Sequence, residues 1–271
     1  MKILGIESSS MVASVALTAD GVTMAEYTVN FKKTHSQTLL PMIDEIVRML
    51  ELELEEVDAI AISAGPGSFT GLRIGSATAK GLGLVLDKPL IPVPTLDAMA
   101  YGLFGTSALL CPMMDARRNQ VYTGLYRCEE QLEVILPSCS MDIGELAKEL
   151  NARRESVIFL GDGVPVHHTF LKEQTEIPVR FAPAHLNRQR ASAVAALGEI
   201  YFMQGRTETA MEHRPDYLKK AQAERELEEA RRQGKTKELA AGHSVGTGEE
   251  HEKDEPDTGD KSRMMPKEES R

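Results

Sequence analysis

The sequence predicts a duplicated α/β architecture, on the basis of three observations. Each half of the first 218 residues opens on short apolar segments separated by turn residues, a pattern typical of antiparallel strands. Each set of strands is followed by helical stripes that alternate with short apolar runs, as in parallel strands joined by helices. The chain has 271 residues, 42% of them apolar, which is enough for one large domain or two small ones.

The first half contains five predicted strands and three predicted helices. The strands lie at residues 2–6, 13–18, 22–29, 57–62 and 90–93. The helices lie at residues 38–50, 70–86 and 96–101, the last capped by Thr95. Because proline disrupts a helix interior, Pro41 indicates that the first helix starts near Thr38 or is kinked at Pro41.

A glycine loop at residues 65–75 leads into the second helix. Within that helix Gly71, Gly75, Ala79 and Gly83 recur every four residues. A glycine inside a helix costs about 1 kcal/mol relative to alanine. We therefore expect these small residues to form a ridge against which another helix packs closely.

The second half repeats the pattern with strands at 108–114, 121–127, 131–136 and 157–160 and helices at 143–150 and 188–205. The chain is accordingly predicted to divide into a first subdomain at 1–103, a reduced second subdomain at 104–218 and a tail at 219–271. The last helix is expected to pack back on the first subdomain. In the tail 26 of 53 residues are charged and none is aromatic, which predicts disorder.

Composition excludes several classes of protein. The net charge of −10 argues against a chain that grips nucleic acid unaided, since phosphate neutralisation needs an excess of Lys and Arg. The three cysteines form no C-x-x-C pair and are expected to be reduced thiols of a cytoplasmic protein. No signal peptide or membrane span is visible, so no membrane partner is expected.

Two turns in the first half are candidate phosphate-binding elements. Glu7, Ser8 and Ser9 follow the first strand, where an acid and hydroxyls can hold a hydrated metal or contact phosphates. The loop that contains Gly65 and Gly67 can present backbone amides to a phosphate, although it lacks the Lys-Ser/Thr of a Walker A motif. An ordinary serine turn and a tight turn with close helix packing remain the alternatives.

The equivalent turn of the second half is degenerate. Asp115 is followed by Ala116 and Arg117, where small residues would be needed for close approach of a phosphate. The histidines are scattered, without the spacing that places two metal ligands on one helical face. The sequence therefore predicts no metal site and nominates no catalytic residue.

The chain resembles the TsaB (YeaZ) family, of the actin-like ATPase and sugar kinase superfamily, in five segments: ILGIESSSMVASVAL, HSQTLLPMID, SAGPGSFTGLRIGSATAKGL, DARRNQVY and GDG. The resemblance runs from Lys2 to about Glu226, and its most specific part is GPGSFTGLRIG. It implies an actin-like (ribonuclease H-like) duplicated fold, with two mixed sheets flanked by helices and a reduced second subdomain.

The resemblance also implies a role in making threonylcarbamoyladenosine, a modified adenosine next to the anticodon of tRNAs that read codons beginning with A. In that pathway a TsaD-like subunit with a metal-binding histidine pair catalyses the transfer, and the small ATPase TsaE joins it. TsaB-like chains are implied to be non-catalytic partners that activate TsaD. No cofactor of the chain's own is implied, ATP or ADP can sit at the interface of the complex, and tRNA is bound only through the complex.

The pairing surface implied by the resemblance is a bundle of the first two helices, here residues 36–50 and 70–86. A chain without its partner is expected to form a homodimer through the same helices. A bulky residue at Gly75 or Ala79 is expected to break pairing and leave the fold intact. The expected interface residues are Leu39, Leu40, Ile43, Ile46, Val47, Gly71, Ile74, Gly75, Thr78, Ala79 and Leu82.

Two rival hypotheses remain. In one, the chain is itself an ATP-dependent enzyme of the kinase-like superfamily that uses Glu7, Asp115 and the loop at 65–71. The degenerate second turn argues against it, and Glu7-Ser8-Ser9 stands where the family usually has Asp-Thr-Ser. A peptidase hypothesis has less support, because the sequence shows no nucleophile or metal-ligand set.

Overall fold

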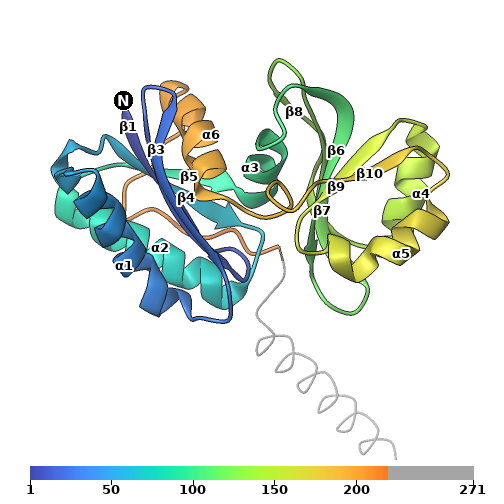
Figure 1. Cartoon of the computed structure of the whole chain (residues 1–271), viewed down its shortest axis with the longest axis horizontal. Coiled ribbons are helices and arrows are strands. Elements are labelled where there is room, and N and C mark those ends of the chain that lie inside the picture. The colour runs from blue at the N-terminus through green and yellow to red at the C-terminus, as the bar shows by residue number, and fades with distance from the viewer. Residues whose placement is uncertain (219–271) are drawn as a thin grey trace, which may run out of the picture. The chain divides into compact units, whose positions relative to one another are not determined.

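The computed structural model describes residues 1–218, which belong to one compact unit. They form two five-stranded sheets flanked by helices (Figure 1). The predictions for the tail at 219–271 lie outside the described residues. The division of the chain at residue 103 stays a prediction.

The first sheet consists of β1 (Lys2–Glu7), β2 (Val12–Ala19), β3 (Val22–Asn30), β4 (Ala59–Gly65) and β5 (Leu90–Pro94). Their order is β3-β2-β1-β4-β5, with antiparallel pairing from β3 to β1 and parallel pairing from β1 to β5. The apolar sides of α1 (His35–Met49) and α2 (Phe69–Leu86) pack on one face. The helix α6 (Ala191–Met203) covers the other face (Figure 1).

The second sheet consists of β6 (Thr106–Asp115), β7 (Gln120–Cys128), β8 (Leu132–Asp142), β9 (Val157–Leu160) and β10 (Val179–Phe181). Its order, β10-β9-β6-β7-β8, repeats the pairing of the first sheet, which confirms the duplicated architecture. The strands β9 and β10 have only four and three residues, against seven and five in β4 and β5, so the second copy is the reduced one.

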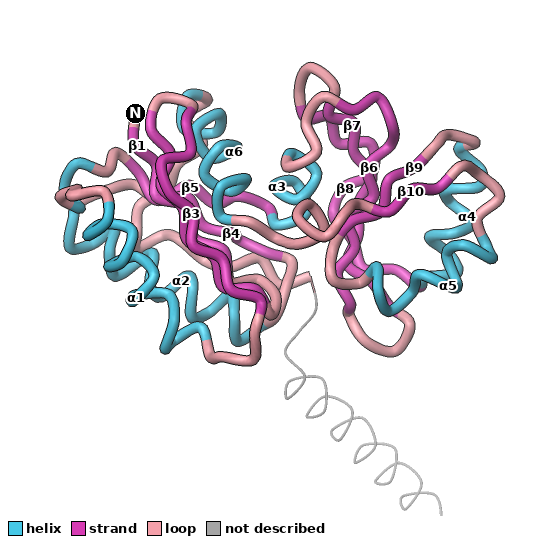
Figure 2. The backbone as a smooth tube through the Cα atoms, in the orientation of Figure 1, coloured by secondary structure: helices cyan, strands magenta, loops and turns pink. Residues whose placement is uncertain are grey.

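Helices cover both faces of the second sheet as well (Figure 2). The helices α4 (Ile143–Arg153) and α5 (Val164–Gln174) pack on one face. The short helix α3 (Thr95–Tyr101) contributes Leu96 and Met99 to the core on the other face. It also contacts β4, β5 and α6, so it touches elements of both sheets.

Several predicted boundaries were wrong. The helix α1 begins at His35, three residues before Thr38, and includes Pro41 in its interior between the buried Leu39 and Met42. Pro94, not Thr95, occupies the cap position of α3. A short 3₁₀ helix (Leu54–Glu56), absent from the predicted elements, precedes β4.

Two elements of the second half have no counterpart among the predicted elements. These are α5 and β10. The apolar stripe of α5 is interrupted by His167 and His168, and β10 is too short to show alternation. Burial of Val164 and Leu171 against the second sheet, rather than a clear sequence period, keeps α5 in place.

The chain after α6 runs back along the first sheet, and we call residues 206–217 the C-terminal strap. Its Glu208 exchanges two backbone hydrogen bonds of 2.9 Å with Leu90. The ammonium of Lys80 on α2 donates to the carbonyl of His213 at 3.1 Å. The amide of Asp216 donates to the carbonyl of Ala64 at 2.6 Å. The strap is therefore fixed to β4, β5 and α2 along its length.

A buried carboxylate ties α3 to elements from both halves of the chain. The hydroxyl of Tyr126 on β7 donates to Asp97 Oδ1 at 3.0 Å, and that of Tyr201 on α6 donates to Asp97 Oδ2 at 3.2 Å. Burial raises the pKa of Asp97, and the two tyrosine hydrogen bonds oppose that rise. Each carboxylate oxygen thus has one donor.

We expect Tyr126→Phe to lower the free energy of unfolding by about 1–3 kcal/mol, because it leaves Asp97 Oδ1 buried without a donor. Urea unfolding at pH 7 measures the change. Tyr27→Phe, at an exposed position of β3, is the matched control. Equal stability of the two variants would show that the carboxylate does not depend on this bond.

Candidate functional site

The candidate site begins at the end of β1, where Glu7 is only 1% exposed. We call residues 8–10 the serine turn. The backbone amide and the hydroxyl of Ser9 both donate to Glu7 Oε1 at 2.6 Å. The side chain of Glu7 therefore bonds to the turn that follows it.

The pKa of Glu7 is raised to about 7, mainly by burial and to a smaller extent by the Asp162 carboxylate, while hydrogen bonds from Ser9 and Ser63 oppose the rise. The carboxyl is thus close to half protonated at neutral pH. A group with that pKa has the acid-base property that catalytic carboxyls need. Its donors are protein groups, however, and it has almost no access to solvent.

The predicted phosphate loops lie directly on one another. The amide of Ser68 donates to the Ser9 carbonyl at 2.6 Å, and Ser8 Oγ donates to the carbonyl of Gly71 at 3.0 Å. A Cβ on Gly67 or Gly71 would collide with the carbonyl oxygen of Ser9 or Ser8, respectively. The structure thus brings Glu7, Ser8, Ser9 and Gly67 together, with the loop at 65–68 packed directly on the serine turn.

The glycine ladder was assigned to the wrong neighbour. A Cβ on Gly75 would collide with Ser8 Oγ, so Gly71 and Gly75 pack on the chain's own serine turn, whereas Gly83 lies against Leu90 and Ala210. Gly65 meets the strap instead, at the Asp216 carbonyl. A bulky residue at Gly75 or at fully buried Ala79 would therefore disturb the fold, contrary to the expectation from sequence.

Most of the predicted interface residues lie inside the chain's own core. Leu39, Ile43, Ile46, Gly71, Gly75 and Ala79 are buried, and Val47, Ile74, Thr78 and Leu82 are half-buried. Leu40 is 55% exposed. The apolar stripe of a helix identifies the face turned to its own sheet, so the buried members of this set hold α1 and α2 in place, and only Leu40 is exposed.

Asp115 stands at the end of β6 and is bound within its own turn. Its carboxylate accepts from the Arg117 amide at 2.9 Å and lies 3.1 Å from the Arg117 guanidinium. Arg117, Arg118 and Asn119 all have positive φ, so this turn is left-handed and carries side chains where glycine would be expected. This geometry agrees with the prediction that the second turn is degenerate.

Two residues of the site, Gln189 and Asp162, were not predicted from the sequence. Gln189 is 1% exposed and bridges two turns, since it accepts from Ser10 Oγ at 3.1 Å and donates to Asp162 Oδ1 at 3.1 Å. Burial raises the pKa of Asp162, which is close enough to raise the pKa of Glu7 in turn. Asp162 lies in the segment Gly161-Asp162-Gly163, which follows a predicted strand, and this position in the sequence could have identified it. No local sequence pattern marks Gln189.

Metal ligands are not gathered in the described part of the chain. No group of three or more His, Cys, Asp or Glu within residues 1–218 is placed to hold a metal ion. His35 bonds to the Val12 carbonyl and His213 to Glu208. None of the described helices is both long and apolar enough to cross a bilayer.

Comparison with known proteins places this fold and these turns in a family. The family model described as "TsaD: tRNA N6-adenosine threonylcarbamoyltransferase" matches residues 25–227. The chain is 32% identical over 227 residues to "tRNA threonylcarbamoyladenosine biosynthesis protein TsaB" of Bacillus subtilis, across 83% of this chain and 96% of that protein. With the protein of the same description from Escherichia coli it shares 38% over 133 residues, 48% of this chain and 57% of that protein.

Solved structures point to the same family. "YeaZ from Pseudomonas aeruginosa" superposes with a TM-score of 0.69 and 26% identity, over 80% of this chain and 99% of that one. The duplicated sheets thus follow the YeaZ fold. The chain belongs to the TsaB (YeaZ) family, as its sequence segments indicated.

We expect Glu7→Gln to remove a pH dependence of stability. The native carboxyl has a pKa of about 7, whereas in the unfolded chain it has the ordinary value. Between those two values the native state binds more protons, so the free energy of unfolding of the wild type falls as pH rises. The fall attributable to Glu7 amounts to about 3 kcal/mol from pH 4 to pH 8.

Urea unfolding of both proteins at intervals across that range tests this expectation. The free energy of unfolding of Glu7→Gln should rise relative to that of the wild type as pH increases, because the amide oxygen still accepts hydrogen bonds from Ser9 and carries no charge. A constant difference between the two curves at all pH values would show that Glu7 titrates near its ordinary pKa.

Proposed function

We propose that the chain is a non-catalytic scaffold and activator subunit in tRNA threonylcarbamoyladenosine biosynthesis. Its partner in this proposal is a TsaD-like catalytic subunit, joined by a TsaE-like ATPase. The names of its relatives and the TsaD family model support the pathway. The observation that carries the scaffold role is an exposed face of α2 whose composition no contact within residues 1–218 explains.

We call this face the outer face of α2, made up of Ala77, Gly81, Leu84 and Val85. Spacings of four and three place these residues on one side of the helix. Leu84 is 55% exposed and Val85 84% exposed. A Cβ on Gly81 would meet nothing within 4 Å, so no contact in the described chain accounts for a glycine that costs about 1 kcal/mol there.

An exposed small residue beside apolar ones fits the close approach of another helix. The outer face thus replaces the buried ridge as the proposed pairing surface, and α1, which packs beside α2, carries a further exposed leucine at Leu40. The same face is proposed to form a homodimer when the partner is missing. Contact with tRNA is left to the complex, since residues 1–218 carry a net charge of −8.

The serine turn and the turn at Asp115 support a non-catalytic role, because their polar groups bond to other groups of the chain. The serine turn is buried under the loop at 65–68, and Asp115 is bound by Arg117. In the proposed complex, ATP or ADP would bind where the subunits meet. The rival hypothesis of an ATP-dependent enzyme uses Glu7, Asp115 and the loop at 65–71, and the raised pKa of Glu7 is the observation that favours it.

Calorimetry of the isolated chain with ATP and Mg²⁺ separates these hypotheses. The scaffold proposal expects no saturable heat up to about 1 mM nucleotide, because tighter binding requires an open phosphate site. Saturable binding together with release of phosphate would favour the enzyme. Glu7→Gln, which should abolish only a genuine turnover, is the control for contaminating ATPase.

We expect Gly81→Arg to weaken pairing with the TsaD protein of the same genome by about tenfold or more, because a bulky charge enters the apolar contact. The fold should persist, since the new side chain enters open space and arginine favours helix by up to about 1 kcal/mol over glycine. Calorimetric titration measures the affinity, and a melting curve measures the fold.

The matched control is Val166→Arg, which places the same side chain on an exposed apolar position of α5. Its affinity should stay within about twofold of the wild type. If Gly81→Arg pairs as tightly as the control, the outer face of α2 is not the interface. Sedimentation of each variant alone reports the homodimer.

A further inference from the structure

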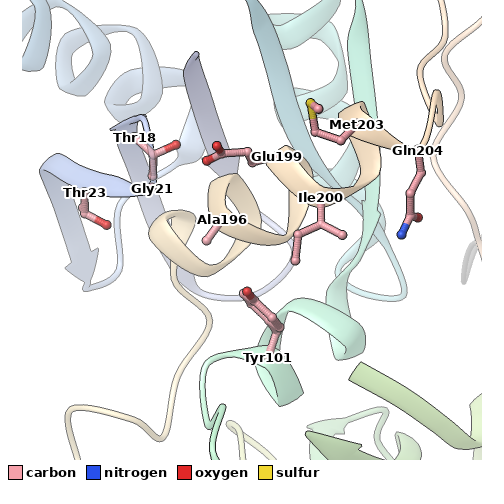
Figure 3. A pocket seen from close by; sticks show the side chains of 9 residues that line it. All are labelled: Thr18, Gly21, Thr23, Tyr101, Ala196, Glu199, Ile200, Met203 and Gln204. Atoms are coloured by element: carbon pink, nitrogen blue, oxygen red, sulfur yellow. The ribbon is translucent and has the colours of Figure 1, made fainter. Parts of the chain in front are cut away.

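A cavity of about 530 Å³ lies away from the serine turn, among the β2–β3 hairpin, the end of α3 and the outer side of α6 (Figure 3). That volume is in the range of small-ligand sites. No step of the proposed function uses it. It is lined by Thr18, Gly21, Thr23, Tyr101, Ala196, Glu199, Ile200, Met203 and Gln204.

Thr18 is the first unexplained group in this cavity. Its side chain is 2% exposed, and its hydroxyl oxygen has no hydrogen-bond partner among the described residues. A buried polar atom left in that state costs about 1–3 kcal/mol. An occupant of the cavity that forms a hydrogen bond with it would recover that free energy.

Glu199 is the second unexplained group in this cavity. Its carboxylate forms no hydrogen bond or ion pair with any residue of the described range 1–218. The amino group of Met1, whose pKa it helps to raise, is itself bound to Asp20. In Figure 3 the carboxylate of Glu199 and the hydroxyl of Thr18 point toward one another. An unpaired anion and an unpaired hydroxyl therefore share one end of the cavity.

The remaining walls define what can enter. Ala196, Ile200 and Met203 supply an apolar side. Tyr101 adds an aromatic ring to the wall, and aromatic rings attract cations. An anion would be repelled by Glu199, and a neutral apolar molecule would leave both polar groups without partners.

We propose that this cavity binds a primary ammonium carried on a short aliphatic chain. The ammonium has three donors and no acceptor, which suits a carboxylate and a hydroxyl with free acceptor capacity. The methylene groups lie against Ile200 and Met203. The same chemistry is presented by a free alkylamine and by a lysine side chain of another protein, and the test separates these two sources.

The test titrates the full chain by calorimetry in 150 mM NaCl with two probes, n-pentylamine and Nα-acetyl-lysine methylamide. 1-Pentanol is the uncharged control ligand. We expect at least one amine to bind with a Kd below about 1 mM and 1-pentanol to bind about tenfold more weakly or not at all. The tighter of the two amines identifies the source. Absence of binding by both amines at 10 mM overturns the proposal.

Three variants locate the binding. Glu199→Gln should weaken it about tenfold and Thr18→Val about threefold. Glu173→Gln, which removes the same charge from an exposed position of α5, should stay within about twofold and so controls for attraction by the net charge. Melting curves verify that each variant is folded. If Glu199→Gln binds like Glu173→Gln, the ammonium is not held in this cavity.

Discussion

The packing of α2 on the serine turn is the constraint on which the first sheet and its surroundings depend. Because Gly71 and Gly75 have no Cβ, the backbone of α2 can contact Ser8. That contact fixes the height of α2 above β1 and β4. It also fixes the position of α1, which packs beside α2, and of the strap, which bonds to Lys80. The outer face of α2 is therefore presented by a helix that cannot shift without disturbing the turn.

Much of the fold could be predicted from the sequence, because strands and helices leave local patterns. The strand β9 and the helix α2 follow from apolar runs and glycine punctuation, and the repeated order of strands makes the second sheet recognisable. The spacing of small residues predicted close packing correctly but could not say against what. Periodicity identifies a face of a helix and not its neighbour, so the core face of α2 was mistaken for its outer one.

The candidate site shows the same limit. Glu7 and Ser9 are two residues apart in sequence, so their association could be predicted. Ser10 and Gln189 are 179 residues apart, and nothing near Gln189 marks it as a polar bridge. Asp97 likewise gains its two tyrosine donors from β7 and α6. Buried polar groups of this kind are satisfied by tertiary structure, which leaves no local sequence pattern.

The C-terminal strap has a practical consequence for the handling of this protein. Its last contacts are made by Asp216, against Ala64 and Gly65, and by Tyr217, whose ring lies 4.8 Å from that of Phe69. A chain truncated before Asp216 would uncover the end of β4 and the first turn of α2. Truncation or fusion after Tyr217 preserves these contacts, and a reporter attached there would be tethered beside the loop at 65–68.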